Sequence, residues 1–165
     1  MICDLSAASR GLCQMTDTIR RLMPADAAAA AALHAQGFAD AWSAASIEAL
    51  IASPNVLALG WEEGGDLLAF ALFQSSAGDC ELLTIATAPA RRGQGLAGAL
   101  LEAAMPMLVV GGDSRLLLDV AEDNASARRL YSRFGFTEDG RRKRYYTAGR
   151  PAPVDAILMS RPIGA

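Results

Sequence analysis

The 165-residue chain is poor in aromatic residues, which make up 6% of it, and it contains one histidine and three cysteines. It has no run of about eighteen uncharged apolar residues, which excludes a membrane-spanning helix and predicts no membrane partner. Cys3, Cys13 and Cys80 form no C-x-x-C pair, and His34 is not near them at a zinc-ligand spacing. We therefore expect reduced thiols, no metal cofactor and a cytoplasmic protein.

Apolar residues are abundant, because 52% of the chain is hydrophobic and 20% is charged. Such a chain can bury a core, which excludes disorder as its main state. The net charge of −3 argues against a surface that binds nucleic acid directly. The length fits one domain, which we assign to residues 18–165. Residues 1–17 show no hydrophobic period and are expected to form a flexible N-terminal extension.

Hydrophobic periodicity and turn residues predict strands and helices in the first half of the domain. Asp26 and Ser43 stand where helix N-caps are expected. Gly64-Gly65 separates two apolar runs, as in a hairpin. The predicted elements, in order, are a strand at 18–22, helices at 27–35 and 44–52, and hairpin strands at 56–62 and 67–74.

The second half of the domain also contains predicted strands and helices in turn. Pro106 is expected to kink or shorten a helix that begins near Gln94, Asn124 to cap the next helix, and Gly135 to end it. The predicted elements are strands at 81–87 and 115–120, each followed by one of these helices, and two final strands, from 136 onward and at 154–159, around a basic loop. This order predicts an α/β fold with a mixed central sheet flanked by helices.

A glycine-rich turn, Arg91-Arg92-Gly93-Gln94-Gly95-Leu96-Ala97-Gly98, lies between a predicted strand and a predicted helix. Glycines let a phosphate approach the backbone, and a helix start offers unpaired N–H groups and the positive end of the dipole. A phosphate-bearing ligand is one interpretation of this segment. Close packing of the helix start is the other.

Two families of phosphate ligand fit the turn. The spacing Gly93-x-Gly95-x-x-Gly98 matches the dinucleotide fingerprint, with Asp119 downstream as the acidic residue. However, a loop containing Pro89 separates the first glycine from its strand, and too little sequence follows to complete a doubly wound sheet. A nicotinamide cofactor is therefore disfavoured.

The pattern Arg92-x-x-Gly95-x-Ala97 in the same turn resembles the pyrophosphate-binding motif of the GNAT acetyltransferase superfamily. The chain is similar in particular to the RimI-type ribosomal-protein alanine N-acetyltransferases, over roughly Thr18 to the end. The segments that carry this likeness are Phe38 to Ser43, Leu83 to Thr87, Leu118-Asp119-Val120, Asn124 to Ala127, Leu130-Tyr131, Gly135-Phe136, Arg142 to Tyr146 and Asp155 to Met159.

The resemblance implies a single GNAT-like domain that uses acetyl-coenzyme A as its cosubstrate, without a metal. It implies that backbone groups of one strand hold the pantetheine and the thioester, that the turn binds the pyrophosphate, and that an asparagine contacts the cofactor arm. An ordinary core strand is the alternative for the first of these. The implied cofactor-binding residues are Ile85, Ala86, Thr87, Arg92, Gly93, Gln94, Gly95, Leu96, Ala97, Gly98 and Asn124.

The resemblance also implies catalytic residues. Tyr131 matches the family tyrosine that protonates the departing thiolate, although its spacing also suits a core aromatic residue. Asp119 stands where the family has a glutamate that acts as general base, and its shorter side chain withdraws the carboxylate by about 1.5 Å. Glu81, on the neighbouring strand, is the alternative base.

The acceptor is implied less strongly. Tyr145 and Tyr146 match family positions that line the peptide groove, with strand packing as their alternative, and Trp42 is expected to border the groove from the other side. An α-amine, with a pKa of about 8, loses its proton more readily than a lysine amine at about 10.4. The expected partner is therefore a protein N-terminus, such as the N-terminal alanine of a small-subunit ribosomal protein, and the chain is expected to be a monomer or weak dimer. A small-molecule amine acceptor and a catalytically weak coenzyme A-binding module remain as alternatives.

Overall fold

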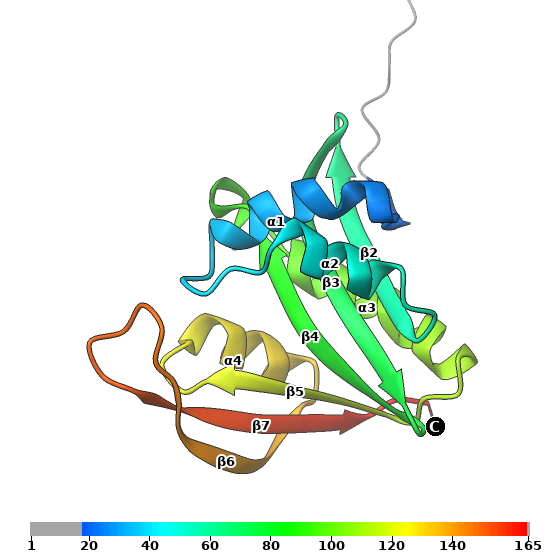
Figure 1. The fold of residues 1–165 in the computed structure, drawn as a ribbon. Coiled ribbons are helices and arrows are strands. Elements are labelled where there is room, and N and C mark those ends of the chain that lie inside the picture. Colours follow the sequence, from blue (N-terminus) through cyan, green and yellow to red (C-terminus); the bar gives the residue numbers. More distant parts are fainter. Residues whose placement is uncertain (1–17, 165) are drawn as a thin grey trace, which may run out of the picture.

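The computed structural model describes residues 18–164; the expected flexible extension, residues 1–17, lies outside them, as do Cys3 and Cys13. The described residues form a seven-stranded sheet in the order β1-β2-β3-β4-β5-β7-β6, with four α-helices on its faces (Figure 1). The α/β prediction is confirmed. The elements are β1 (Thr18–Arg21), α1 (Ala27–Ala35), α2 (Ala44–Ile51), β2 (Val56–Glu63), β3 (Asp66–Ser76), β4 (Asp79–Thr87), α3 (Leu96–Val110), β5 (Arg115–Ala121), α4 (Ala125–Arg133), β6 (Thr137–Tyr146) and β7 (Val154–Pro162), with short 3-10 turns at Pro24–Asp26 and Pro89–Arg91.

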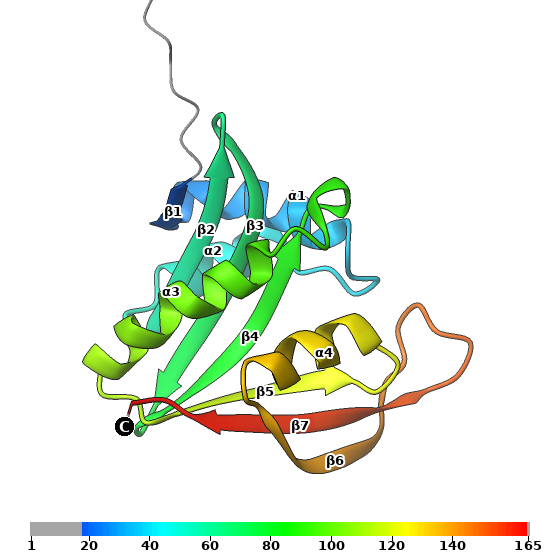
Figure 2. The ribbon, with the colours of Figure 1, turned by 180° about the vertical axis from the view of Figure 1, so that it is seen from behind.

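The sheet divides between β4 and β5. These two strands are parallel, unlike all other neighbours in the sheet, and they pair only where residues 79–81 lie opposite residues 115–117. Beyond this short ladder the strands diverge, as Figures 1 and 2 show. We call the opening between them the split. β4 is therefore paired with β3 on one edge and unpaired on the other from Leu82 to Thr87.

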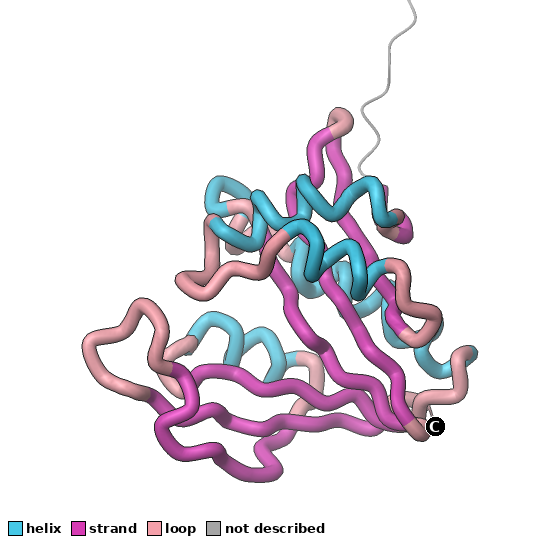
Figure 3. Tube along the Cα trace, viewed as in Figure 1, coloured by secondary structure: helices cyan, strands magenta, loops and turns pink. Residues whose placement is uncertain are grey.

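Each face of the sheet has its own buried cluster. The cluster under α1 and α2 includes Ile47 and Phe70, both fully buried. The larger cluster, under α3 and α4, includes Leu100, Leu118 and Tyr131. Figure 3 shows α1 and α2 in front of the strands, and Figure 2 shows α3 and α4 on the opposite side. The split therefore lies in a sheet whose two faces are each covered by a packed pair of helices.

Local signals in the sequence set the ends of two helices. Ser43 Oγ accepts a hydrogen bond from the Ser46 N–H at 3.1 Å and starts α2, while Asn124 Oδ1 accepts one from the Ala127 N–H at 3.1 Å and starts α4. Gly135, with a φ of 79°, follows the last turn of α4. The predicted caps at Ser43 and Asn124 and the predicted end at Gly135 are confirmed.

Asp26 is the N-cap residue of α1, as predicted, but its side chain makes no capping hydrogen bond to the helix. The carboxylate instead accepts hydrogen bonds from the Arg20 guanidinium at 2.9 Å and from the Met23 N–H at 2.7 Å. The bonds from Arg20 hold the pKa of Asp26 below its ordinary value. Arg20 of β1 therefore holds the Asp26 carboxylate away from the N–H groups at the start of α1.

The predicted shortening of α3 at Pro106 does not occur, because the helix runs unbroken from Leu96 to Val110. A proline removes the hydrogen bond to the carbonyl four residues earlier, here that of Glu102. Both residues lie on the exposed side of the helix, where water can satisfy that carbonyl.

The basic run Arg141–Arg144 lies within β6 and is exposed, and the connection to β7 spans residues 147–153, where Arg150 is the basic residue. The ladder between β6 and β7 shifts register after Arg142, and Arg144 has a φ of 54°. Asp155 accepts the Arg144 N–H at 2.9 Å and fixes this bulge.

Candidate active site

The unpaired edge of β4 offers backbone groups to the split. The Ala88 N–H donates to the Leu68 carbonyl of β3 at 2.8 Å. Because backbone groups alternate sides along a strand, those of Ala86 also face β3, whereas those of Ile85 and Thr87 face the split. An extended ligand lying along β4 can therefore pair with Ile85 and Thr87.

The turn after β4 presents a series of free donors. Gly93 and Gly95 have φ values of 75° and 87°, a left-handed conformation that favours glycine. None of the N–H groups from Gly93 to Gly98 donates to another backbone or side-chain group within residues 18–164, and the first bond of this helix runs from the Ala99 N–H to the Gly95 carbonyl. These donors, together with the helix dipole, form a site for an anion.

The side chains of this turn have different roles. Leu96 is buried in the core beneath α3. Gly98 packs against α4, because a methyl group there would lie 3.3 Å from the Phe134 ring. Gln94 accepts a hydrogen bond from Arg91 Nε at 2.8 Å, which holds the turn together. Gly98 thus combines both interpretations of the motif, since it allows close packing and has a free N–H.

The two arginines of the turn differ in availability. Arg91 forms an ion pair with Glu63 of β2, so its charge is already neutralised by a neighbouring strand. Arg92 is exposed, and its Nε donates only a long bond of 3.4 Å to the Thr87 carbonyl. Within residues 18–164 it has no carboxylate partner. Arg92 is therefore the cation free to contact a phosphate beside the turn.

Tyr131 extends from the inner side of α4 and is 5% exposed. Its ring packs edge-on against Phe136, with the centroids 5.6 Å apart. Burial, with a smaller contribution from Tyr146, raises the pKa of its hydroxyl above the ordinary value. In the described part of the chain, the only fully buried side-chain polar atom without a partner is Trp61 Nε1. The unpaired Tyr131 hydroxyl therefore reaches accessible surface, and it keeps its proton at neutral pH.

Asp119 lies on β5 where the strand has separated from β4. Its neighbours Leu118 and Val120 belong to the core under α3 and α4, so its side chain points to the α1 and α2 face. The carboxylate lies 3.1 Å from Arg142 Nη1. Burial and then the charge of Asp119 raise the pKa of Tyr146. An acid and a phenol thus face each other on this side of the split.

Glu81 occupies a different place. It is exposed and lies opposite Leu117, in the short ladder that joins β4 to β5. Asp119 lies two residues further along β5, past the end of that ladder. The structure brings Asp119 to the split and leaves Glu81 at its closed end.

Tyr145 and Tyr146 end β6 as a perpendicular ring pair, 5.2 Å between centroids. Arg142 lies over the Tyr145 ring and Arg150 over the Tyr146 ring, each 5.4 Å from the centroid. Tyr145 is 52% exposed, whereas Tyr146 is half-buried. The exposed ring is available to a ligand, and the buried one borders Asp119.

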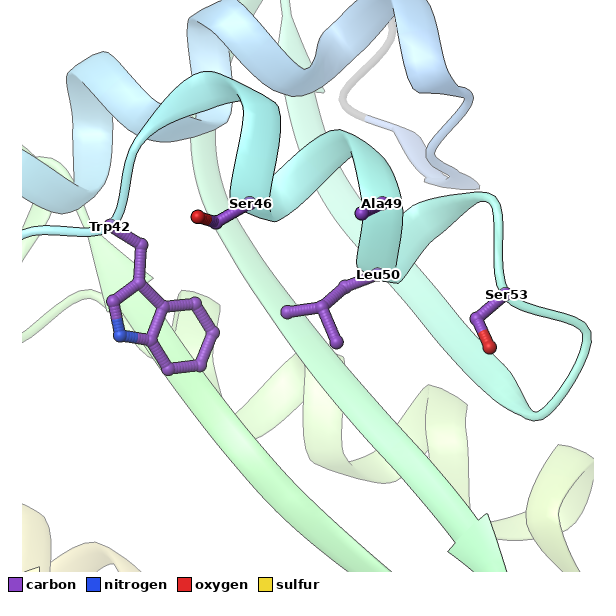
Figure 4. Close-up of a pocket in the computed structure, with 5 residues that line it drawn as sticks. All are labelled: Trp42, Ser46, Ala49, Leu50 and Ser53. Carbon is purple, nitrogen blue, oxygen red and sulfur yellow. The ribbon is translucent and has the colours of Figure 1, made fainter.

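Trp42 comes from the opposite side, immediately before α2. Its indole points from the helix layer toward the strands, as does the Leu50 side chain (Figure 4). They line a pocket of about 450 Å³ under α2, with Ser46, Ala49 and Ser53. This pocket lies on the same face of the sheet as Asp119.

Sequence reasoning missed the contacts that join these two sides. The loop between α1 and α2, residues 36–43, meets the loop between β6 and β7, residues 147–153: a methyl group at Gly149 would lie 2.6 Å from the Ala39 methyl. Arg150 of the second loop pairs with Asp123 at 2.8 Å, next to Asn124. No local signal could have predicted these pairings, because the partners are far apart in sequence.

A thiol nucleophile is not available among the described residues. Cys80 is fully buried in the core, and burial raises the pKa of its thiol to about 12. Residues 18–164 contain no group of three or more His, Cys, Asp or Glu side chains that could hold a metal ion. In the same residues no helix combines the length and apolarity needed to span a membrane.

Comparison with known proteins places this arrangement in a family. The model of the acetyltransferase (GNAT) family matches residues 26–136. The chain is 35% identical over 153 residues to the N-alpha-acetyltransferase RimI of Mycobacterium tuberculosis, covering 89% of this chain and 93% of that protein. It is 34% identical over 104 residues to the ribosomal protein bS18-alanine N-acetyltransferase of Haemophilus ducreyi, covering 63% of this chain and 72% of that protein.

Solved structures agree. The ribosomal-protein-S18-alanine N-acetyltransferase of Escherichia coli superposes with a TM-score of 0.84 at 32% identity, over 91% of this chain and 96% of that one. The acetyl-coenzyme A complex of Arabidopsis thaliana NAA60 shares the fold, with a TM-score of 0.78 at 18% identity, over 91% of this chain and all of that one. The expected family is thereby confirmed: the chain belongs to the GNAT acetyltransferases.

Proposed function

We propose that this protein transfers an acetyl group from acetyl-coenzyme A to the N-terminal α-amine of a protein, with the N-terminal alanine of a small-subunit ribosomal protein as the first candidate acceptor. The observation that carries the proposal is the similarity, over about nine-tenths of the chain, to proteins named for this reaction. The geometry of the split supports it.

The residues present suit coenzyme A. Within residues 18–164, the N–H groups from Gly93 to Gly98 have no acceptor and Arg92 has no carboxylate partner, which suits a diphosphate. The open edge at Ile85 and Thr87 matches the amide-containing pantetheine arm, which can extend the sheet like a strand. Asn124 Oδ1 is used by the cap, which leaves its amide N–H₂ free for the same arm.

The cosubstrate supplies a thioester carbonyl that an amine can attack. Asp119 accepts a proton from the amine, directly or through water, while the new C–N bond forms. An N–H of the open β4 edge stabilises the negative charge that develops on the carbonyl oxygen. As the C–S bond breaks, Tyr131 donates its proton to the departing sulfur. The α-amine requires only a modest base, because its pKa of about 8 leaves a neutral fraction at pH 7.

The acceptor approaches from the face that carries Asp119. Tyr145, Tyr146 and Trp42 border this face, from β6 and from the start of α2. Their aromatic rings suit a peptide backbone and a small first side chain. We propose these three residues as the walls of the acceptor groove.

Purified protein given acetyl-coenzyme A and peptides with different N-termini is expected to release coenzyme A thiol, fastest with an N-terminal alanine. The same peptide with a blocked N-terminus and an internal lysine is the control and is expected to be inactive. Faster turnover of polyamines or aminoglycosides than of any peptide would assign a small-molecule acceptor. No thiol release with either class would favour a coenzyme A-binding module.

Asp119→Asn is expected to lower kcat about 10²-fold or more, because it removes the proposed base without changing the size of the side chain. Glu81→Gln is the matched control and is expected to leave kcat within about twofold, since its carboxylate lies at the closed end of the split. Steady-state kinetics with the alanine peptide measures both. The opposite ranking of the two variants would transfer the role of base to Glu81.

A further inference from the structure

We propose that His34, the single histidine, is a positioning residue: in its neutral form it holds the α1–α2 loop, residues 36–43, across the open end of the split, and its protonation releases that loop. The inference rests on the proposed function, because the loop leads into Trp42 of the acceptor groove. It assigns to this site a dependence on pH that acts through a residue outside the proposed chemical step.

The hydrogen bonds of His34 define its protonation state. The ring is 2% exposed, and its Nδ1 accepts the backbone N–H of Trp42 at 3.2 Å. Its Nε2 lies 3.2 Å from Thr84 Oγ1 of β4. Because Nδ1 must be an acceptor, Nε2 carries the proton and donates to Thr84. One neutral imidazole thus ties the loop to the strand that borders the split.

Stacking extends the same contact along the loop. The Phe38 ring lies parallel to the imidazole, with centroids 4.1 Å apart and an angle of 4°, and the Trp42 ring lies 5.3 Å away at 26°. Phe38 is 42% exposed, and one face of its ring is covered by His34. The two aromatic residues of the loop are therefore positioned by one side chain.

The loop held in this way closes a ring of contacts around the split. Ala39 touches the loop between β6 and β7 at Gly149. That loop is tied to the turn after β5 by Arg150, which pairs with Asp123 at 2.8 and 3.0 Å. The path runs from β4 through His34 and both loops to β5, and thus connects the two strands that diverge. Loosening His34 opens this path on the acceptor side.

Protonation conflicts with these contacts. A charged imidazole has two N–H donors, so Nδ1 can no longer accept from Trp42. The groups facing the ring from β3, β4 and the loop are Phe70, Thr84, Phe38 and Trp42, and none can balance a positive charge. The loop carries one carboxylate, that of Asp40, which is exposed and forms no hydrogen bond or ion pair with the imidazole among residues 18–164. The Arg92 guanidinium beside the loop, 3.2 Å from the position of a methyl group at Gly37, has the same sign as a protonated imidazole. Burial lowers the pKa of His34 below 6.5.

Between the lowered pKa of folded His34 and the unfolded value of about 6.5, the unfolded chain binds more protons, so stability and loop closure fall as the pH decreases through this range. We expect the KM for the alanine peptide to rise about two- to tenfold between pH 7 and the folded pKa, relative to a variant without the histidine in which only the peptide amine titrates. This is the effect of losing one hydrogen bond, and little change is expected in the affinity for coenzyme A.

The test uses full-length protein carrying Trp61→Phe, so that Trp42 is its only tryptophan. Trp42 fluorescence and peptide KM are followed from pH 5 to pH 8. His34→Asn keeps an acceptor oxygen near the position of Nδ1 but cannot titrate, so it is expected to show a flat fluorescence profile and a peptide KM that changes only with protonation of the peptide amine. His34→Ala is expected to show the released state at every pH, with a raised KM and unchanged coenzyme A affinity.

Identical fluorescence profiles for the histidine-containing protein and for His34→Asn would overturn the proposal that His34 holds the α1–α2 loop. Fluorescence also separates the two proposals, because it reports the loop even if no peptide is acetylated. A Trp42 signal that titrates, without peptide turnover, would contradict the proposed function but support the role of His34 in holding the loop. Turnover of the peptide with a KM that does not depend on His34 would support the proposed function and overturn the role of His34.

Discussion

Tyr131→Phe is expected to lower kcat by about 10²- to 10⁴-fold, the range for loss of a general acid, with little change in the KM for acetyl-coenzyme A. The substitution removes only the hydroxyl. The ring that packs against Phe136 remains, and the hydroxyl has no partner within residues 18–164 that would be left unsatisfied. Stability is therefore expected to be nearly unchanged. Single-turnover measurement of thiol release is the direct test.

The control for Tyr131→Phe is the binding of coenzyme A, followed by calorimetry. Equal affinity in the parent and variant, together with slow turnover, assigns the hydroxyl to the chemical step. A variant as fast as the parent would mean that Tyr131 is a core aromatic residue and that water protonates the thiolate.

Gly95→Val is expected to weaken coenzyme A binding by about 10- to 100-fold. Gly95 has a φ of 87° at the start of α3, where a β-branched residue costs about 1–3 kcal/mol. If the turn relaxes to relieve this strain, the N–H groups around it no longer point at one anion. Calorimetric titration with coenzyme A measures the loss.

Gly112→Val is the matched control for Gly95→Val. Gly112 has a φ of 98°, no atom lies within 4 Å of a methyl group added there, and the same is true of Gly95. Gly112, however, lies in the turn between α3 and β5, outside the proposed site. Both variants are expected to lose similar stability, but only Gly95→Val is expected to lose affinity. Equal affinity in the two variants would exclude the turn from diphosphate binding.

The parts of the fold that depend on neighbouring residues could be predicted from the sequence. Ser43 and Asn124 cap helices through a residue three positions later, and Gly64-Gly65 joins two strands that pair with each other. Such signals act over a few residues, so a single sequence contains them. The glycine-rich turn from Arg92 to Gly98 could be recognised as a possible phosphate site from its residue types, whereas the other candidate site residues came from the family resemblance.

The structure departs from these expectations where distant residues intervene. The Asp26 carboxylate pairs with Arg20 of β1, and Pro106 is tolerated because it faces solvent rather than the core. Residue types alone do not determine strand register, and the divergence of β4 and β5 depends on that register. For the same reason the sequence could not show that the backbone groups of Ala86 face β3 while those of Ile85 and Thr87 face the split. His34 could be recognised only as a helix residue, since its role depends on the folding of two loops.

The divergence of β4 and β5 also bears on self-association. Unpaired strand edges invite pairing with other chains and lead to aggregation, which most proteins prevent by placing charges or prolines on their outermost strands. Here the unpaired edge lies in the interior of the sheet, and β5 runs in register with β4 until residue 117 before turning away. The unpaired edge of β4 therefore has β5 as its neighbour in the sheet, unlike the outer edges of β1 and β6. Its position inside the sheet keeps this edge apart from the outermost strands, where pairing between molecules begins.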